Sequence, residues 1–259
     1  MKVRVLSPAM GAEVTGIDLS VPLDDAMVND LRGLWLEHQM IVIRDQDLTP
    51  AKQLKFAKAL GEPDTYPFLK GLDGFPMITE VLKKEEETVN FGGVWHSDTT
   101  YQTCPPMATL LYAKELPPLG GDTLFACQYL AFANLSAPLR DVLEQLRAVN
   151  ASGKKRVSST RSERLKDSAS GVNPNDLAGI HPVVRTHPET GKKALFINAA
   201  HTTNFEGWSA EESRGLLEYL FMHQILPEFQ CRLSWKVGDV ALWDNRCVQH
   251  YPLNDYHGH

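Results

Sequence analysis

The chain has 259 residues, of which 43% are hydrophobic and 22% are charged, and its formal net charge is −6. This composition is typical of a folded globular protein. The acidic balance argues against nucleic acid as a partner, because binding to a phosphate backbone requires clustered lysines and arginines. No apolar run approaches the ~20 residues that a membrane span needs, so we expect no membrane partner either.

The cysteines and the first residues indicate a compartment. Cys104, Cys127, Cys231 and Cys247 form no C-x-x-C pair, and their spacings match neither a zinc ribbon nor a disulfide scaffold. The opening residues lack the apolar stretch of a secretory signal peptide. We therefore expect reduced thiols and a cytoplasmic protein.

The first 60 residues predict mixed secondary structure. The predicted elements are a strand at Val3–Leu6, a helix from Asp24 to His38, a buried strand at Met40–Ile43, and a helix that begins after Thr49 and ends at Gly61. Thr49 is the predicted N-cap of the second helix, because its hydroxyl can accept a backbone N–H bond. Pro50 fits the first helical position, where no backbone N–H is needed.

From Met77 onward the pattern changes to short apolar runs separated by turns. The predicted strands are Met77–Val81, Val94–Asp98, Ala108–Ala113, Thr123–Cys127, Val183–Thr186, Ala194–Asn198, Cys231–Trp235 and Val240–Trp243, and the predicted helices are Leu139–Val149 and Ala210–Gln224. Ser209 and Glu212 form a capping box before the second of these helices. Many short strands and few helices predict a mainly β fold, a sandwich or jelly roll with flanking helices. We expect residues 1–259 to form a single domain with an irregular insertion near 151–177.

The sequence Val94-Trp95-His96-Ser97-Asp98 carries the clearest chemical pattern. On a strand, residues two apart project from the same face, so His96 and Asp98 would point together. His250 follows the predicted strand Val240–Trp243 and could supply a third ligand. Two imidazoles and one carboxylate on one face of an octahedron are typical of iron(II) sites with open positions. From spacing alone a surface hydrogen bond between His96 and Asp98 stays open, because the chain has nine histidines.

Four longer blocks of sequence extend this pattern over the chain. They are WHSDTTY at 95–101, GGDTL at 120–124, HPVVRTHP at 181–188, and ALWDNR at 241–246 running on to His250, and they follow the opening GAEVTGIDLS at 11–20. In this order they resemble the taurine dioxygenase and 2,4-dichlorophenoxyacetate dioxygenase family. The resemblance implies a double-stranded β-helix, iron(II), and the co-substrates 2-oxoglutarate and O2. It also implies hydroxylation of a C–H bond with release of succinate and CO2.

The resemblance implies roles for single residues. His96, Asp98 and His250 match the family's metal ligands, and Thr123 matches a threonine that donates a hydrogen bond to a carboxylate of 2-oxoglutarate. The carboxylate of Asp98 would fill the coordination position that a halide occupies in halogenating relatives, so hydroxylation is favoured over halogenation. We interpret the histidines of the HPVVRTHP block as structural.

Two departures from the family pattern concern the substrate and the co-substrate. Tyr66 stands where taurine-oxidising members have a histidine, and a phenol carries no positive charge near pH 7. We therefore expect a small anion other than taurine: another sulfonate, a sulfate ester, an aryloxyalkanoate or a carboxylate. The family's arginine for the distal carboxylate of 2-oxoglutarate would fall beyond His259, so we expect a truncated C-terminus. Neither Arg185 nor Arg246 is placed at the co-substrate by the sequence.

Two alternatives stay open at this point. One is an amino-acid hydroxylase of a biosynthetic pathway, which uses the same cofactors on another substrate. The other is a non-enzymatic jelly-roll protein that binds a metal or a ligand. Whether the enzyme acts on a small anion or on an amino acid, its partner is a small-molecule substrate. We also expect a homo-oligomer, a dimer or a tetramer.

Overall fold

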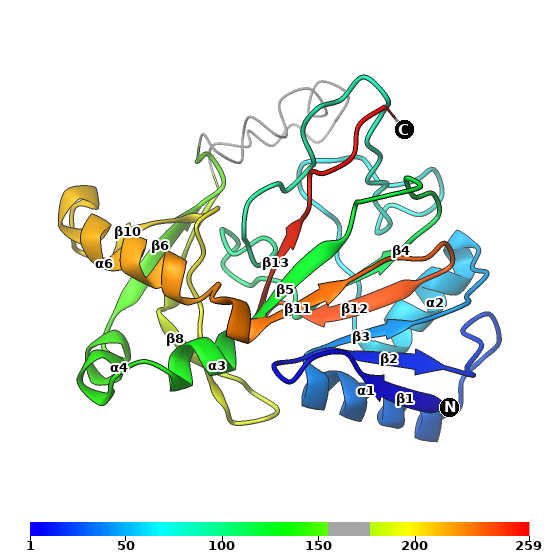
Figure 1. The fold of residues 1–259 in the computed structure, drawn as a ribbon, viewed down its shortest axis with the longest axis horizontal. Helices are drawn as coiled ribbons and strands as arrows, with labels where there is room; N and C mark the ends of the chain where they lie inside the picture. The colour runs from blue at the N-terminus through cyan, green and yellow to red at the C-terminus, as the bar shows by residue number, and fades with distance from the viewer. Residues whose placement is uncertain (155–176, 259) are drawn as a thin grey trace.

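The computed structural model describes residues 1–154 and 177–258, so the insertion predicted near 151–177 lies almost wholly outside the described residues. Figure 1 shows two packed sheets on one side of the molecule and a smaller group of strands and helices on the other. Among the described helices, none is both long and apolar enough to cross a membrane.

The larger sheet has five strands and is covered by helices on one face. Its spatial order is β1 (Lys2–Val5), β2 (Ala12–Thr15), β3 (Met40–Ile43), β12 (Val240–Asp244) and β4 (Ala108–Tyr112). Only the pairing of β2 with β3 is parallel. The helices α1 (Asp25–His38) and α2 (Pro50–Leu60) lie against this sheet in Figure 1. The sheet therefore presents its other face to the rest of the domain.

Strand β3 shows why an unbroken apolar run is needed at the centre of this sheet. All four of its residues are buried. Ile41 and Ile43 pack with the apolar residues of α1 and α2. Met40 and Val42 point to the opposite face and pack into the space between the two sheets. A central strand that is covered on both faces reads as a continuous hydrophobic run.

The second sheet has three strands and closes the sandwich. Its order is β11 (Gln230–Leu233), β5 (Thr123–Cys127) and β13 (Val248–Pro252), all antiparallel. Phe125 of β5 meets Trp243 of β12 with their ring centroids 5.5 Å apart. The inner faces of both sheets share one buried apolar cluster. The mainly β jelly roll predicted from the sequence is confirmed by this arrangement.

A third group of elements packs at the side of the sandwich. It comprises β6 (Arg147–Ala151), β7 (Ala178–Pro182) and β10 (Thr202–Phe205) in one sheet, β8 (Val184–Thr186) and β9 (Lys193–Leu195) in a hairpin, and α3 (Gln128–Ala133), α4 (Ala137–Leu143), α6 (Ala210–His223) and the 3-10 turn η2 (Pro227–Phe229). Leu217 and Leu220 of α6 pack on Phe205 of β10 in a separate core. This group borders the site through the turn between β9 and β10.

The helix starts predicted from capping signals at Thr49 and Ser209 are confirmed. Thr49 accepts a hydrogen bond from the backbone N–H of Lys52, with Pro50 in the first turn. Ser209 and Glu212 form the predicted capping box at the start of α6. These short-range signals depend only on neighbouring residues, which is why the sequence alone locates them.

Three predicted elements are wrong. Residues 77–81 form no strand, and residues 94–98 form none either, apart from an isolated bridge at His96. The predicted helix Leu139–Val149 is instead the end of α4, a turn, and the start of β6. Leu143, Leu146 and Val149 recur at intervals of three and so imitate one face of a helix. Tertiary pairing of Ala148 with His181 of β7 overrides that local pattern.

Candidate functional site

A backbone bridge brings the two histidines of the predicted site together. His96 N donates to His250 O at 3.1 Å, and His250 N donates to His96 O at 2.8 Å. His250 belongs to β13, opposite Phe125 of β5, so its ring points toward the inner face of the sandwich. The ring centroids of His96 and His250 are 4.1 Å apart.

Asp98 completes the group, although not by the geometry that a strand would give. It lies in a turn, followed by Thr99 at φ 50°, a left-handed conformation that a β-branched residue rarely adopts. Its Oδ1 is 3.4 Å from His96 Nε2 and 4.0 Å from His250 Nε2. All three ligand atoms lie within 4.8 Å of one another. The structure thus brings His96, Asp98 and His250 to one point.

The orientation of His96 is fixed by its surroundings. Its Nδ1 is 2.7 Å from the carbonyl oxygen of Val94. A carbonyl only accepts, so Nδ1 carries a proton and donates this bond, and Nε2 is the ring nitrogen that faces Asp98. Gly92 packs against the same ring: a Cβ on Gly92 would lie 3.0 Å from Cε1 and 3.2 Å from Nε2 of His96. The imidazole is therefore held with Nε2 toward Asp98.

The charges at the site favour an ionised carboxylate beside a neutral imidazole. Burial opposes ionisation of Asp98, but the charges of His250 and His96 and the hydrogen bonds from His96 and Thr109 outweigh it and hold the pKa of Asp98 well below its usual range. Burial, followed by the charge of His96, lowers the pKa of His250 to about 3. A carboxylate and a neutral imidazole are the forms that bind transition metals.

The donor set and the spacing fit one transition-metal ion. Two ligand atoms bound to one ion at about 2.0–2.2 Å each lie no more than about 4.4 Å apart. Both distances from the Oδ1 atom of Asp98 meet this limit. Two neutral imidazoles with one carboxylate are the donor set of facial iron(II) sites. The residues present therefore fit the metal that the sequence predicts.

Thr123 lies on the inner face of β5, on the same side as Phe125 and His250. The alternation of side chains along a strand places it two residues, about 7 Å, from Phe125, opposite Pro252 of β13. Its Oγ1 accepts a hydrogen bond from Trp235 Nε1 at 3.0 Å. Because that bond uses an oxygen lone pair, the hydroxyl hydrogen remains available for donation, and among the described residues no acceptor is recorded for it.

A pocket opens beside His96 and Asp98. Its wall includes His96, Asp98 and Tyr66, so the residue predicted to contact substrate does line the pocket. The remaining lining residues, which sequence reasoning missed, are Phe91, Gly92, Val94, Thr99, Tyr101, Ala200 and His201. Thr99 and Tyr101 belong to the WHSDTTY block, which could have pointed to them. His201 lies in the turn between β9 and β10, and no local pattern marked it.

The two histidines interpreted as structural have partners that fit that interpretation. His181 Nε2 lies 2.9 Å from the carbonyl oxygens of both Thr100 and Gln102, so it donates to the loop that carries Tyr101. His187 Nε2 lies 3.0 Å from Asp244 Oδ2, and its Nδ1 accepts backbone N–H bonds. Each ring supports a loop of the fold.

The group His187, Asp244 and Cys247 also has metal-like spacing. Its chemistry is that of a structural cluster instead. Both nitrogens of His187 are engaged in hydrogen bonds, and Arg246 donates to both oxygens of Asp244. Burial keeps the pKa of Cys247 well above its usual value, so the thiol stays protonated. None of the three therefore offers the thiolate, free imidazole nitrogen or unpaired carboxylate that a metal ion requires.

Comparisons with known sequences agree with this geometry. Residues 2–259 match the model of the family "Taurine catabolism dioxygenase TauD, TfdA family". An alkylsulfatase of Acinetobacter baylyi is 34% identical over 99% of this chain and 81% of its own length. An alpha-ketoglutarate-dependent sulfate ester dioxygenase of Pseudomonas putida is 34% identical over 99% of this chain and 85% of its own.

Solved structures give the same result. A taurine dioxygenase from Burkholderia xenovorans superposes with a TM-score of 0.79 at 33% identity, covering 97% of this chain and 83% of that one. The structure of AAD-2 in complex with Mn(II) and N-oxalylglycine has a TM-score of 0.78 at 25% identity, covering 97% and 90%. The match over nearly the whole length, together with the same fold, shows that the chain belongs to the TauD/TfdA family of dioxygenases.

Proposed function

We propose that this protein is an iron(II)- and 2-oxoglutarate-dependent dioxygenase that hydroxylates a small organic anion and releases succinate and CO2. The observation that carries the proposal is the convergence of His96, Asp98 and His250, the first two of which line the pocket. The membership in the TauD/TfdA family supports the reaction class, because its named relatives depend on alpha-ketoglutarate, that is, 2-oxoglutarate. A non-enzymatic jelly-roll protein is not supported by these relatives.

In this proposal His96, Asp98 and His250 hold the iron. When bound, iron(II) supplies the redox chemistry that couples decarboxylation of 2-oxoglutarate to hydroxylation of a C–H bond by O2. Three protein ligands leave three coordination positions for the co-substrates. With the metal bound, the Asp98 carboxylate would fill the position that a halide would need, so the expected product is an alcohol and not a halide.

Thr123 is the proposed contact to a carboxylate of 2-oxoglutarate. Trp235 donates to its oxygen and so leaves the hydroxyl hydrogen for the co-substrate. A neutral hydrogen bond of this kind contributes roughly 0.5–1.5 kcal/mol net. That is less than a carboxylate buried without a charged partner loses in solvation, so Thr123 serves mainly to orient the co-substrate.

Tyr66 is the proposed contact to substrate. It lines the pocket between Phe68 and Phe91, whose rings meet its own edge-on. A phenol and aromatic rings favour a substrate with apolar bulk next to its polar group. Relatives act on sulfate esters, sulfonates and 2,4-dichlorophenoxyacetate, as their names state. We therefore propose a sulfate ester, sulfonate, aryloxyalkanoate or carboxylate other than taurine.

The test is succinate production by the iron(II)-loaded protein across a panel of these four substrate classes, with taurine and free amino acids included. At least one anion should raise succinate formation above the uncoupled rate and give a hydroxylated product. His96→Ala should abolish both. Turnover of amino acids alone would favour the amino-acid hydroxylase, and succinate production by His96→Ala at the wild-type rate would contradict the site.

The cellular setting belongs to the same proposal. All four cysteines are free thiols, which supports a reducing compartment, the cytoplasm. A small molecule is the expected partner. The homo-oligomeric state, a dimer or a tetramer, stays a prediction that sedimentation velocity would measure.

A further inference from the structure

We infer that Thr109 and Asn245 form a positioning relay that makes Asp98 a one-oxygen ligand of the metal. This inference rests on the proposed function. Thr109 lies on β4, and its hydroxyl is 2.5 Å from Oδ2 of Asp98. Asn245 lies in the turn between β12 and β13, and its Nδ2 is 2.9 Å from Oγ1 of Thr109. Neither residue touches the pocket.

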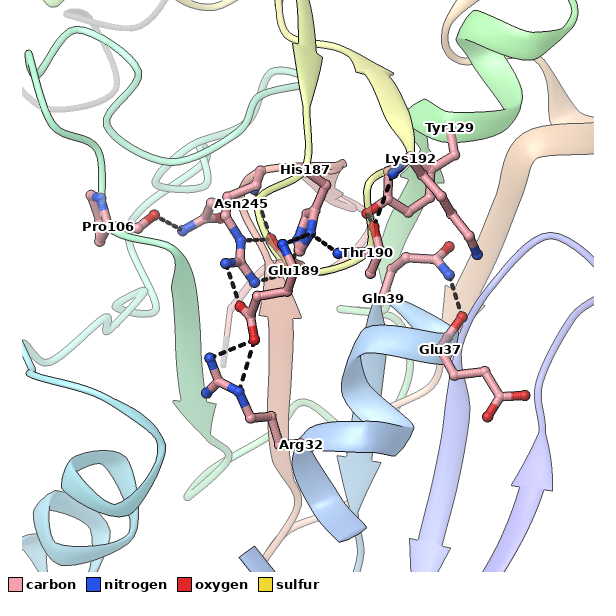
Figure 2. Close-up of polar contacts among 12 residues, drawn as sticks. Arg32, Glu37, Gln39, Pro106, Tyr129, His187, Glu189, Thr190, Lys192 and Asn245 are labelled. Atoms are coloured by element: carbon pink, nitrogen blue, oxygen red, sulfur yellow. Dashed lines mark hydrogen bonds and ion pairs between the residues drawn. The ribbon is translucent and has the colours of Figure 1, made fainter. Parts of the chain in front are cut away.

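The direction of the hydrogen bonds along this relay follows from its outer end. Asn245 Nδ2 also lies 3.4 Å from the carbonyl oxygen of Pro106, a contact visible in Figure 2. A carbonyl oxygen only accepts, so the atom facing it is the donating nitrogen of the amide. The same nitrogen therefore donates to Thr109. The Thr109 oxygen accepts this bond, so its own hydrogen is directed to Asp98.

The relay acts on one oxygen of Asp98 and leaves the other free. Oδ2 accepts from Thr109, whereas Oδ1 is the oxygen near Nε2 of both His96 and His250. A carboxylate whose second oxygen is engaged binds a metal through one oxygen. A carboxylate binding through both would fill a fourth coordination position. The relay thus preserves the open positions that two-point binding of 2-oxoglutarate and O2 require.

Charged neighbours hold Asn245 in place. It stands between Asp244 and Arg246, and Arg246 donates to both oxygens of Asp244 and to Glu189 at 2.7 Å. Glu189 in turn accepts from Arg32 of α1 at 2.9 Å. Figure 2 shows the contact between Glu189 and Arg32 beside Asn245. The turn is therefore rigid, which a residue acting through another one requires.

Metal affinity tests the relay without any need to know the substrate. The probe is Co(II), titrated anaerobically into metal-free protein and followed by its visible absorption. Thr109→Val keeps the side-chain shape but removes the hydroxyl, and it should weaken Co(II) binding by about 10–100-fold. Thr109→Ser keeps the hydroxyl and should bind Co(II) like wild type. Thr203→Val is the matched control, because Thr203 is a strand threonine whose hydroxyl bonds elsewhere, to Val149 O and Asn204.

A second variant separates a relay from two independent contacts. Asn245→Ala should weaken Co(II) binding by a smaller factor, and the same change in the Thr109→Val background should have no further effect, because Asn245 acts only through Thr109. Thermal unfolding of each metal-free variant verifies folding. If Thr109→Val does not fold, a loss of Co(II) affinity in Asn245→Ala tests the relay by itself. Wild-type affinity in both single variants would overturn the relay. Wild-type protein that binds no Co(II), or undiminished binding in Asp98→Ala, would instead refute the metal site itself.

Discussion

At the scale of single residues, the site depends on a close contact between Gly92 and His96. Gly92 has φ 72°, and a Cβ there would meet the His96 ring at 3.0–3.2 Å. Gly92→Ala should displace the imidazole and weaken iron(II) binding by about tenfold or more, in the range seen when groups that orient a ligand are lost. Gly207→Ala is the control, because Gly207 has φ 81° and nothing within 4 Å. If both variants bind iron(II) equally well in calorimetry, the backbone strain of a positive φ, and not contact with His96, would explain any loss of affinity.

Substrate choice is also argued at this scale, through Tyr66. Tyr66→His introduces a side chain that is roughly half protonated at pH 6.5. A charge-assisted hydrogen bond contributes about 1.5–3 kcal/mol, so kcat/KM for taurine should rise about tenfold or more relative to the best wild-type substrate. Tyr66→Phe should give no such rise. A wild-type protein that already prefers taurine to every other anion would contradict the role given to Tyr66.

At the scale of elements, the turn from β12 to β13 is held by Asp244. Burial alone would raise the pKa of this carboxyl, but hydrogen bonds from Arg246 and His187 hold the pKa below its ordinary value. Asp244 therefore contributes stability above about pH 3.9, the unfolded value, and this contribution is lost as the pH falls through the lower folded value. Asp244→Asn should cost on the order of 3 kcal/mol at pH 7, and progressively less as the pH falls below about 3.9.

Thermal unfolding at several pH values measures this effect. Asp73→Asn serves as the control, because Asp73 is an exposed carboxylate beside Lys70, and it should leave the unfolding temperature unchanged at pH 7. A difference between wild type and Asp244→Asn that stays constant from pH 7 to pH 3 would mean that the carboxylate charge is not what stabilises the turn.

Elements were predictable where short-range signals set them. The central strand 40–43 is a pure apolar run, and the caps at Thr49 and Ser209 are local. The strand predicted at residues 94–98 is wrong because a strand there would need pairing with β13 along its length, and only His96 pairs. The expected convergence of His96 and Asp98 nevertheless holds, through a turn and not through strand alternation.

At the scale of the whole molecule, the fold explains what the sequence could and could not locate in the site. His250 lies far from His96 in the sequence. Its place after a predicted strand and the family resemblance both suggested it as the third ligand, and the pairing of β13 with β5 positions it. His201 enters the pocket from the turn between β9 and β10, in a separate part of the fold. Its position depends on how the group of strands β6 to β10 packs beside the sandwich, and no local sequence pattern predicts that packing.

The relay of Thr109 and Asn245 shows the same limit. The sequence marks Asn245 only as part of the ALWDNR block, and nothing marks Thr109. The pairing of Thr109 with Trp243 across β4 and β12 brings the two residues together. Supporting residues of this kind become visible only when the sheet is assembled.

The most direct test of the account is an anaerobic titration of 2-oxoglutarate into iron(II)-loaded protein. A metal held by His96, Asp98 and His250 with adjacent open positions should let 2-oxoglutarate chelate the iron. The visible charge-transfer absorption should then saturate at one 2-oxoglutarate per iron. The same titration of His250→Ala should give none. An absorption of wild-type intensity in His250→Ala, or none in the wild-type protein at saturating 2-oxoglutarate, would contradict the account.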